Sequence, residues 1–296
     1  MRIAVTGKHG QVVSSLIERG RLSGLEITAL GRPELDLADP DSIRRSLLDA
    51  KADVIVSAAA YTAVDKAETD QANVFEVNTR GPASIANFAA EHGIPLVHIS
   101  TDYVFSGEKP TPYCEDDHPS PTSVYGRSKL AGEDAVAEAS PNHVILRTSW
   151  VYSPFGNNFL KTMLRLAETQ DVVSVVADQH GTPTSALDIA DAIIEVSRQL
   201  TSTRDPSLRG RFHLSGTGET TWAGFAEVIF ERLYTRSGRR SQVKRIPSRD
   251  YPTPAKRPAN SRLSSKKLAN SYGIILPEWE KSTVATVDRL LERKTD

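Results

Sequence analysis

Short apolar runs alternate with longer amphipathic stretches along the first half of the chain. The pattern predicts strands at 2–7, 26–31, 53–60, 96–101 and 143–150, with helices between them at 11–20, 39–50, 70–92 and 125–140. The strands are nearly unbroken runs of apolar, often β-branched residues, which is typical of strands covered on both faces. The alternation therefore predicts an α/β fold, a Rossmann-type doubly wound parallel sheet with helices on each side.

The pattern changes after Trp150. Helices are predicted at 157–169, 186–200, 221–236 and 277–293, separated by short strands at 173–178 and 210–216 and by a proline-rich loop at 251–263. We therefore predict two parts. Residues 1–150 form a Rossmann domain for a nucleotide cofactor. Residues 151–296 form mainly a smaller, substrate-binding C-terminal region, with some segments returning to the Rossmann sheet.

Composition narrows the classes of function. The chain has 296 residues, a formal net charge of −1 and 25% charged residues, so we expect no nucleic-acid or membrane partner. No apolar run approaches the ~20 residues that span a bilayer, and the N-terminus lacks a signal-peptide layout. Cys114 is the only cysteine, which favours a reducing, cytoplasmic setting. The histidines are scattered without zinc-ligand spacing, and we predict no metal site.

The stretch "TGKHGQVV" follows the first predicted strand. Gly7 and Gly10 fit a tight turn into a helix, where glycine can adopt positive φ and let the backbone approach a pyrophosphate. The helix from Gln11 would direct its free N–H groups at that anion. Val13 stands where such turns usually carry a third glycine, so we expect the helix to sit slightly further from the strand. The alternative is a βα turn without a ligand.

The residues after the second strand distinguish two cofactors. An acidic residue there favours NADH, whereas an arginine accommodates the 2′-phosphate of NADPH. Arg32 comes first, which favours NADPH, and Glu34 keeps NADH possible. Arg32 could also be an ordinary solvated loop residue.

A tyrosine and a lysine stand four residues apart at the start of a predicted helix, in "YGRSK". Tyr125 and Lys129 therefore lie on one face of the helix, and a nearby ammonium lowers the pKa of a phenol. Thr101 ends the fourth strand, where its hydroxyl could hydrogen-bond a substrate carbonyl. A hydroxyl, a phenol and an ammonium beside a dinucleotide indicate hydride transfer to a carbonyl. The alternative is a capping threonine with a surface Tyr–Lys pair.

With these motifs the chain resembles the extended short-chain dehydrogenases/reductases and, within them, the family of dTDP-4-dehydrorhamnose reductases. The resemblance covers nearly the whole chain. It rests on "TGKHGQ", "VIVSAAAYTAVDKAE", "VNTRGP", "HISTDYVFSG", "SVYGRSKLAGE", "ILRTSWVY", "GNNFLKTMLRLA", "DQHGTPT" and "YPTPAKRPANSRL". It implies reduction of the 4-keto group of dTDP-4-dehydro-6-deoxy-L-mannose to dTDP-L-rhamnose, with NADPH as the cofactor and NADH also possible. The partner would then be a dTDP-sugar substrate, and the reaction would be a step of polysaccharide biosynthesis.

The resemblance also implies roles for particular residues. The cofactor would be bound by Gly7, Gly10, Gln11, Arg32, Asp36, Leu37, Ala58, Ala59, Tyr61, Tyr125 and Lys129. Thr101, Tyr125 and Lys129 would be catalytic, with Tyr125 as the proton donor. The substrate would contact Thr101, Asp102, Val104, Tyr125, Trp150 and Asn158, and Thr148 and Ser149 would face the nicotinamide and sugar. Some family members dimerise around a metal held by acidic residues. Ser14 and Ser15 occupy that region here, so we predict a metal-free monomer or homodimer.

Other functions share parts of this pattern. Related dehydratases carry an Asp-Glu pair where this chain has Asp102-Tyr103, so the acid/base glutamate for elimination is missing. Epimerases share the tyrosine and the lysine, and reductases of other dTDP-4-keto-deoxysugars would share nearly every residue. A non-catalytic subunit similar to the regulatory subunit of methionine adenosyltransferase is the remaining class. The loop 106–123 could be a lid or a connector, and Lys256 and Arg257 could bind a diphosphate or face solvent.

Overall fold

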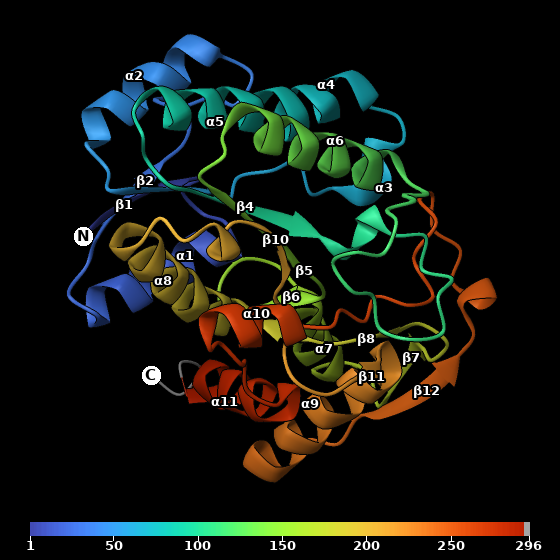
Figure 1. The fold of residues 1–296 in the computed structure, drawn as a ribbon. Coiled ribbons are helices and arrows are strands. Elements are labelled where there is room, and N and C mark those ends of the chain that lie inside the picture. The colour runs from blue at the N-terminus through green and yellow to red at the C-terminus, as the bar shows by residue number, and fades with distance from the viewer. Residues whose placement is uncertain (293–296) are drawn as a thin grey trace.

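The computed structural model describes residues 1–292, and its centre is a six-stranded sheet (Figure 1). The strands are β1 (Arg2–Thr6), β2 (Glu26–Leu30), β3 (Val54–Ser57), β4 (Leu96–Thr101), β5 (His143–Thr148) and β10 (Gly210–His213). They pair in parallel in the order β10-β5-β4-β3-β1-β2. The predicted doubly wound sheet is confirmed, although the strand predicted at 53–60 ends at Ser57. The strand order reverses between β1 and β3, which is where such folds bind ligands.

The strand β10 enters the central sheet from the C-terminal half of the chain. It lies parallel to β5, with Phe212 opposite Leu146 and His213 opposite Arg147. The sheet is therefore completed by a segment that follows β5 by more than sixty residues along the chain.

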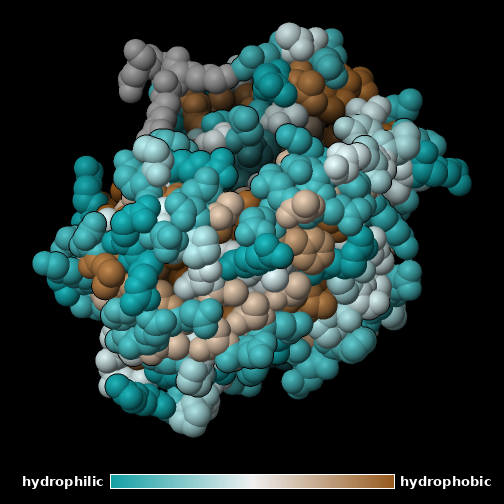
Figure 2. Space-filling model, turned by 90° about the horizontal axis from the view of Figure 1, so that it is seen from above, coloured by the Kyte–Doolittle hydropathy of each residue, from teal (hydrophilic) through white to brown (hydrophobic). Residues whose placement is uncertain are grey.

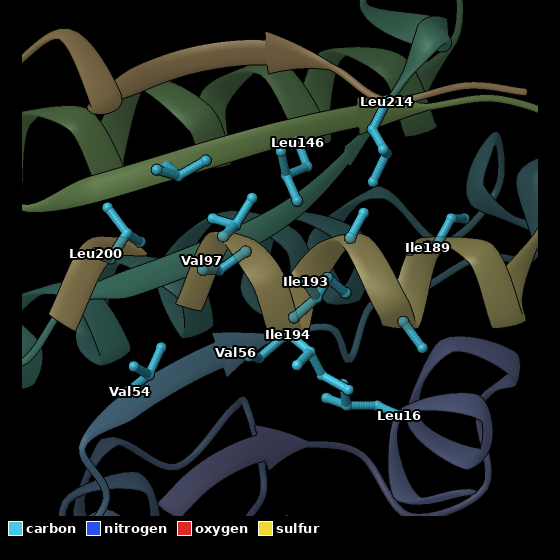
Figure 3. Close-up of a cluster of buried hydrophobic side chains, with 14 of the residues drawn as sticks. Leu16, Val54, Val56, Val97, Leu146, Ile189, Ile193, Ile194, Leu200 and Leu214 are labelled. Carbon is cyan, nitrogen blue, oxygen red and sulfur yellow. The ribbon is translucent and has the colours of Figure 1, made fainter. Parts of the chain in front are cut away.

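Two layers of helices cover the sheet. One face carries α1 (Gln11–Leu22) and α8 (Ala186–Ser202), the other α2 (Pro40–Ala50), α5 (Gly81–Glu91) and α6 (Val124–Ala139). Figure 3 shows Ile189, Ile193 and Ile194 of α8 lying against side chains of the strands, among them Val97 and Leu146. These apolar side chains are almost wholly buried, which favours the folded state by about 1.5–3 kcal/mol for each large one. The outer surface over α2, α5 and α6 is mostly hydrophilic (Figure 2).

The helix predicted at 70–92 is interrupted. It consists of α4 (Gln71–Phe75), a π-helical turn over Glu76–Arg80, and α5. The wider turn directs the buried Asn78 inward, where its side chain accepts from the backbone N–H of Tyr61 and donates to the hydroxyl of Ser128. A π turn often marks a functional position, and this one connects the loop after β3 to α6.

The C-terminal region has its own core. Its helices are α7 (Phe159–Ala167), α9 (Trp222–Ser237) and α11 (Trp279–Glu292), whereas α10 (Lys266–Tyr272) packs against β10 and buries Leu268 and Tyr272 in the core of the central sheet. A parallel pair joins β7 (Val172–Val176) to β12 (Gln242–Ile246), and short pairs join β6 (Val151–Tyr152) to β9 (Thr184–Ser185) and β8 (His180–Gly181) to β11 (Thr220–Thr221). Neither β12 nor α10 was predicted. Phe225, Ile229 and Leu160 lie at the centre of this core.

The loop 106–123 is bonded to the C-terminal segment that contains the proline-rich stretch. The side-chain amide of Asn260 donates to the backbone oxygens of Lys109 and Thr111, at 2.6 and 2.9 Å. The backbone N–H of Tyr113 donates to the oxygen of Arg262 at 2.8 Å. These contacts hold the loop in one place. No helix within residues 1–292 is long and apolar enough to cross a membrane.

Candidate active site

A cavity of about 580 Å³ opens at the carboxyl ends of the central strands. It joins residues that follow four different strands, as expected at the switch point of a doubly wound sheet. The sequence-predicted residues that line it are Gly7, Gly10, Gln11, Ala58, Ala59, Thr101, Asp102, Tyr125, Lys129, Thr148, Ser149 and Trp150. Residues distant in sequence thus meet around one space.

The glycine turn and the first turn of α1 line this cavity. Gly7 has φ +105°, a conformation that favours glycine, and its N–H donates to the oxygen of Leu30 at 2.6 Å. Gly10 differs from our expectation, because it is extended with φ −68° and is the N-cap of α1. No side chain caps the helix there, so its first N–H groups remain available. Such a helix N-terminus suits a pyrophosphate.

Val13 packs in the core beneath the turn. Its side chain is 2% exposed, and its Cγ2 lies only 3.2 Å from where a Cβ on Gly7 would stand. The valine therefore occupies space that the absence of a side chain at Gly7 leaves open. Because Gly7 has no side chain, a valine fits at position 13, where such turns usually carry their third glycine.

The residues after β2 lie outside the lining of this cavity. Arg32 is largely exposed and pairs with Asp36 at 2.9 Å, and Glu34 pairs with Lys8. Leu37 is buried among apolar side chains. Because β2 neighbours β1, these residues lie beside the glycine turn. Arg32 is thus an exposed residue close to the turn that could bind a pyrophosphate, and it does not line the cavity.

Lys129 is a buried cation held by main-chain and side-chain acceptors. It is 2% exposed, and its Nζ donates to the backbone oxygen of Ile99 at 2.7 Å. The Nε2 of the fully buried His98 lies 3.3 Å from the same nitrogen, and His98 Nδ1 lies 3.1 Å from the hydroxyl of Ser57. Burial lowers the pKa of Lys129 to about 8, although Glu133 opposes the shift.

Tyr125 sits at the first turn of α6, whose N-cap Ser123 accepts from the N–H of Gly126. Burial raises the pKa of Tyr125 above its usual value, the hydrogen bond with Thr101 opposes that rise, and Asp102 adds to it. Burial therefore outweighs any lowering by Lys129, whose Nζ donates to the backbone oxygen of Ile99. The phenol is therefore protonated at neutral pH, as a proton donor must be before the transfer.

The hydroxyl of Thr148 provides a further test of what the cavity could hold. The Oγ of Thr148 is buried, lines the cavity and has no hydrogen-bond partner among residues 1–292. A buried unsatisfied hydroxyl costs ~1–3 kcal/mol, which a polar ligand would relieve. Together with the uncapped helix N-terminus, it shows that these residues fit a dinucleotide cofactor.

A second cavity of about 720 Å³ lies between the Rossmann sheet and the C-terminal region. Trp150 and Tyr103 line both cavities, and Phe159, Trp222 and Arg257 line the second. The Trp150 ring stacks on the Trp222 ring with centroids 3.7 Å apart. Trp222 was missed by the sequence analysis, because only tertiary contact brings it to the cavity.

Two features allow Trp150 to take this place. Its backbone has φ +49°, which a bulky residue adopts only when its surroundings enforce it. Gly181 provides the room, because a Cβ there would stand 2.4 Å from the Trp150 ring. Gly181 therefore allows the Trp150 ring to pack directly against the backbone, a role that its place in "DQHGTPT" did not indicate.

Arg257 connects the C-terminal loop to the residues next to Tyr125. It donates to Asp65 at 2.6 Å and to the Tyr103 hydroxyl at 3.2 Å. The Tyr103 ring packs edge-on against Tyr125, with centroids 5.4 Å apart. Lys256 instead lies near Glu108, at 3.5 Å, outside both of these cavities.

Two predicted substrate contacts stand elsewhere. Val104 has no exposed surface and packs with Phe105, Tyr113 and Leu263. Asn158 caps α7 and donates to the side-chain oxygen of Gln11 at 2.9 Å. The structure places neither residue in the lining of the two cavities. In the described part of the chain no three His, Cys, Asp or Glu residues gather as a metal site.

Comparisons with known proteins agree with this geometry. The model of the RmlD substrate binding domain family matches residues 1–292. The chain is 54% identical over 291 residues to a dTDP-4-dehydrorhamnose reductase of Sinorhizobium fredii, covering 98% of each chain. A crystal structure of a dTDP-4-dehydrorhamnose reductase from Clostridium acetobutylicum superposes with a TM-score of 0.91 at 35% identity, covering 98% of this chain and 100% of that one. A crystal structure of a dTDP-4-dehydrorhamnose reductase from Bacillus anthracis in complex with NADP superposes with a TM-score of 0.88 at 32% identity, covering 99% of each chain.

Proposed function

The chain belongs to the RmlD substrate binding domain family, and we propose that it catalyses the NADPH-dependent reduction of the 4-keto group of dTDP-4-dehydro-6-deoxy-L-mannose to dTDP-L-rhamnose. The observation that carries this proposal is the meeting of the glycine turn with Thr101, Tyr125 and Lys129 around one cavity. A dinucleotide site and a protonated phenol that share a cavity suit carbonyl reduction.

Each residue has a definite task in this reaction. NADPH, when bound, supplies the hydride that goes to C4 of the sugar. Tyr125 holds a proton and delivers it to the carbonyl oxygen as negative charge develops there. Lys129 lies at i+4 on the same face of α6, where its ammonium would stabilise the phenolate that the transfer leaves. Gly7, Gly10 and Gln11 would hold the pyrophosphate, and Arg32 the 2′-phosphate.

We assign the cofactor to residues 1–150 and the sugar nucleotide mainly to residues 151–296. Trp150, Phe159 and Trp222 form an aromatic wall of the second cavity, which suits a flat base or a sugar face. Arg257 lies at the edge of this wall with hydrogen-bonding capacity that a diphosphate could use. A single exposed cysteine, Cys114, requires no oxidising environment, so we propose the cytoplasm as the compartment and a monomer or homodimer as the active form.

The test is NADPH oxidation in the presence of the keto sugar nucleotide, generated in situ by the enzymes that precede it. Tyr125→Phe should lower kcat by ~10²–10⁴-fold while the Kd for NADPH stays within about twofold. Tyr234→Phe, on the exposed side of α9, is the matched control and should keep wild-type turnover. Tight NADPH binding without oxidation would favour the non-catalytic subunit over the reductase.

A further inference from the structure

His98 is a buried imidazole that the reaction above does not use. It lies on β4, has no exposed surface, and its Nε2 is 3.3 Å from the Nζ of Lys129 on α6. On the other side of the ring, Nδ1 is 3.1 Å from the hydroxyl of Ser57, the last residue of β3. The three buried side chains therefore form a hydrogen-bonded chain from β3 to the cavity, which Lys129 lines.

The contacts of His98 are consistent with one tautomer of the ring. An ammonium has three hydrogens and no lone pair, so it can only donate. Lys129 is mostly charged at neutral pH, because its pKa is about 8, and His98 Nε2 must then accept from it. The hydrogen of the neutral ring is therefore on Nδ1, where it is donated to the Ser57 hydroxyl. Ser57 thus holds the imidazole in the form that accepts from Lys129.

His98 binds the ammonium without carrying a charge of its own. Burial lowers the pKa of His98 well below its usual range, and the charge of Lys129 lowers it further. The second acceptor of Lys129, the backbone oxygen of Ile99 at 2.7 Å, is neutral as well. A carboxylate partner acts differently: the hydrogen bond of Lys109 to Asp117 raises the pKa of Lys109. Neutral acceptors fix the position of an ammonium and leave its charge free to act on other groups.

The carboxylate one turn further along α6 is bound by another cation. Glu133 accepts from Arg147 at 2.6 and 2.9 Å and from the hydroxyl of Ser100 at 2.6 Å. Other titratable groups on the elements packed against α6 include Asp102 and Tyr103 after β4, His143 on β5, and three that belong to ion pairs, Asp65 with Arg257, Glu76 with Arg80, and Glu91 with Arg44. Among residues 1–292, the side chain that hydrogen-bonds the Lys129 ammonium is His98.

We propose that His98 is a positioning residue of the reduction: as a neutral acceptor that Ser57 holds in one tautomer, it fixes the Lys129 ammonium at the cavity. Ile99 and His98 take two of the three ammonium hydrogens. The third is left for a cofactor hydroxyl, or for Tyr125 once it has given up its proton. This inference rests on the proposed function. No bond is made or broken at His98, and its ring stays neutral throughout.

Two replacements of His98 separate this role from simple packing. In His98→Gln the side-chain amide reaches the position of Nε2 and can accept from Lys129, whereas in His98→Asn it reaches only the position of Nδ1, beside Ser57. Both remove the ring, so both should destabilise the fold. Only His98→Asn takes an acceptor from the ammonium, which favours the neutral amine and should lower the pKa of Lys129 from about 8 to about 7. The pKa of Lys129 in His98→Gln should stay close to that of the wild type.

The ionisation of Lys129 can be followed without turnover. The carbon-13 resonance of a lysine Cε reports protonation of its Nζ, and the resonance of Lys129 is identified by its loss in Lys129→Met. The other lysine resonances are the internal control and should titrate as in the wild type. In turnover, kcat of His98→Asn at pH 8 should be ~5-fold below that of His98→Gln, because the charged fraction of Lys129 falls from about one half to about one tenth.

Ser57→Ala tests the same role with the imidazole in place. It removes the acceptor of the Nδ1 hydrogen, so the pKa of Lys129 should fall in the same direction by a smaller amount. Equal pKa values of Lys129 in His98→Asn and His98→Gln would overturn the role of His98. If neither variant folds, an unchanged pKa of Lys129 in Ser57→Ala would overturn it. A wild-type protein that fails to reduce the keto sugar would instead contradict the proposed function, and the resonance of Lys129 would still decide on His98.

Discussion

The indole ring of Trp150 lies flat on the indole ring of Trp222, with centroids 3.7 Å and planes 14° apart. Trp150 follows the fifth strand of the Rossmann sheet, whereas Trp222 begins α9 of the C-terminal region. The stack therefore joins the two parts of the molecule at the boundary between the two cavities. The Trp222 Nε1 also donates to Gln179 at 3.2 Å, which fixes the orientation of the ring.

Removing one ring of this stack should weaken the binding of the sugar nucleotide. We expect Trp222→Ala to raise KM for the keto sugar by about 2- to 10-fold, because a stacked aromatic contact contributes about 0.5–1.5 kcal/mol beyond the area it buries. The Kd for NADPH should change little. Trp222→Phe keeps an apolar ring against Trp150 and should recover most of the affinity. A KM that stays at the wild-type value in Trp222→Ala would place the sugar nucleotide elsewhere.

The two glycines of the first turn should behave differently when replaced by alanine. Gly10 has ordinary backbone angles, and the nearest heavy atom would lie 3.9 Å from a methyl group at this position, so Gly10→Ala should cost at most about 1 kcal/mol of stability. It should nevertheless raise the Kd for NADPH by ~10-fold, because Gly10 lines the cavity and an added methyl group would hinder the close approach of a pyrophosphate to the backbone. Gly7→Ala, at φ +105°, should destabilise the fold by at least about 1–2 kcal/mol. Thermal unfolding and cofactor titration separate the two effects, and unchanged binding in Gly10→Ala would count against a pyrophosphate at this turn.

The exposed Arg32 should distinguish the two nicotinamide cofactors. Arg32→Ala should raise the Kd for NADPH by ~10-fold or more and leave the Kd for NADH nearly unchanged, because only NADPH carries a 2′-phosphate. Arg45→Ala is a suitable control, since Arg45 is similarly exposed on α2 and lies 3.9 Å from Asp39. Equal losses for both cofactors would remove Arg32 from the phosphate site.

The buried Lys129 should make stability depend on pH. Its pKa is 10.5 when unperturbed and about 8 in the folded chain, a decrease of about 2.5. The cost of burying its charge is therefore fully present below pH 8 and is relieved as the pH rises from about 8 to 10.5. At ~1.4 kcal/mol per pKa unit, the wild type should gain about 3 kcal/mol relative to Lys129→Met over that range.

Denaturant unfolding of both proteins between neutral and alkaline pH checks this prediction. Lys109→Met provides the contrast, because hydrogen bonding to Asp117 raises the pKa of Lys109 and should give no such gain. A constant difference between the wild type and Lys129→Met at all pH values would mean that Lys129 keeps its usual pKa.

The sequence was sufficient to predict those site residues whose role follows from their position at the end of a strand or the start of a helix. Gly7, Thr101 and Tyr125 each follow a strand or begin a helix, so the parallel topology alone brings them to one edge of the sheet. The strands themselves were predictable because burial on both faces requires continuous apolar runs.

What the sequence could not reveal depends on contacts between distant segments. Nothing local distinguishes Gly181 from other glycines, since its role arises only when the Trp150 ring lies over it. The same holds for His98, a buried strand residue that reaches Lys129 across the helix–sheet interface. The π turn at Asn78 also escaped prediction, because its apolar periodicity resembles that of an ordinary helix.

The late entry of β10 into the sheet has a consequence for synthesis on the ribosome. When β5 has been made, its outer edge still has no neighbour, because residues Gly210–His213 that pair with it are translated much later. An unpaired edge of a hydrophobic sheet is prone to join other chains. Nascent chains that stall between residues 150 and 210 should therefore depend on chaperones, and a gene split at residue 150 should yield an aggregating N-terminal fragment.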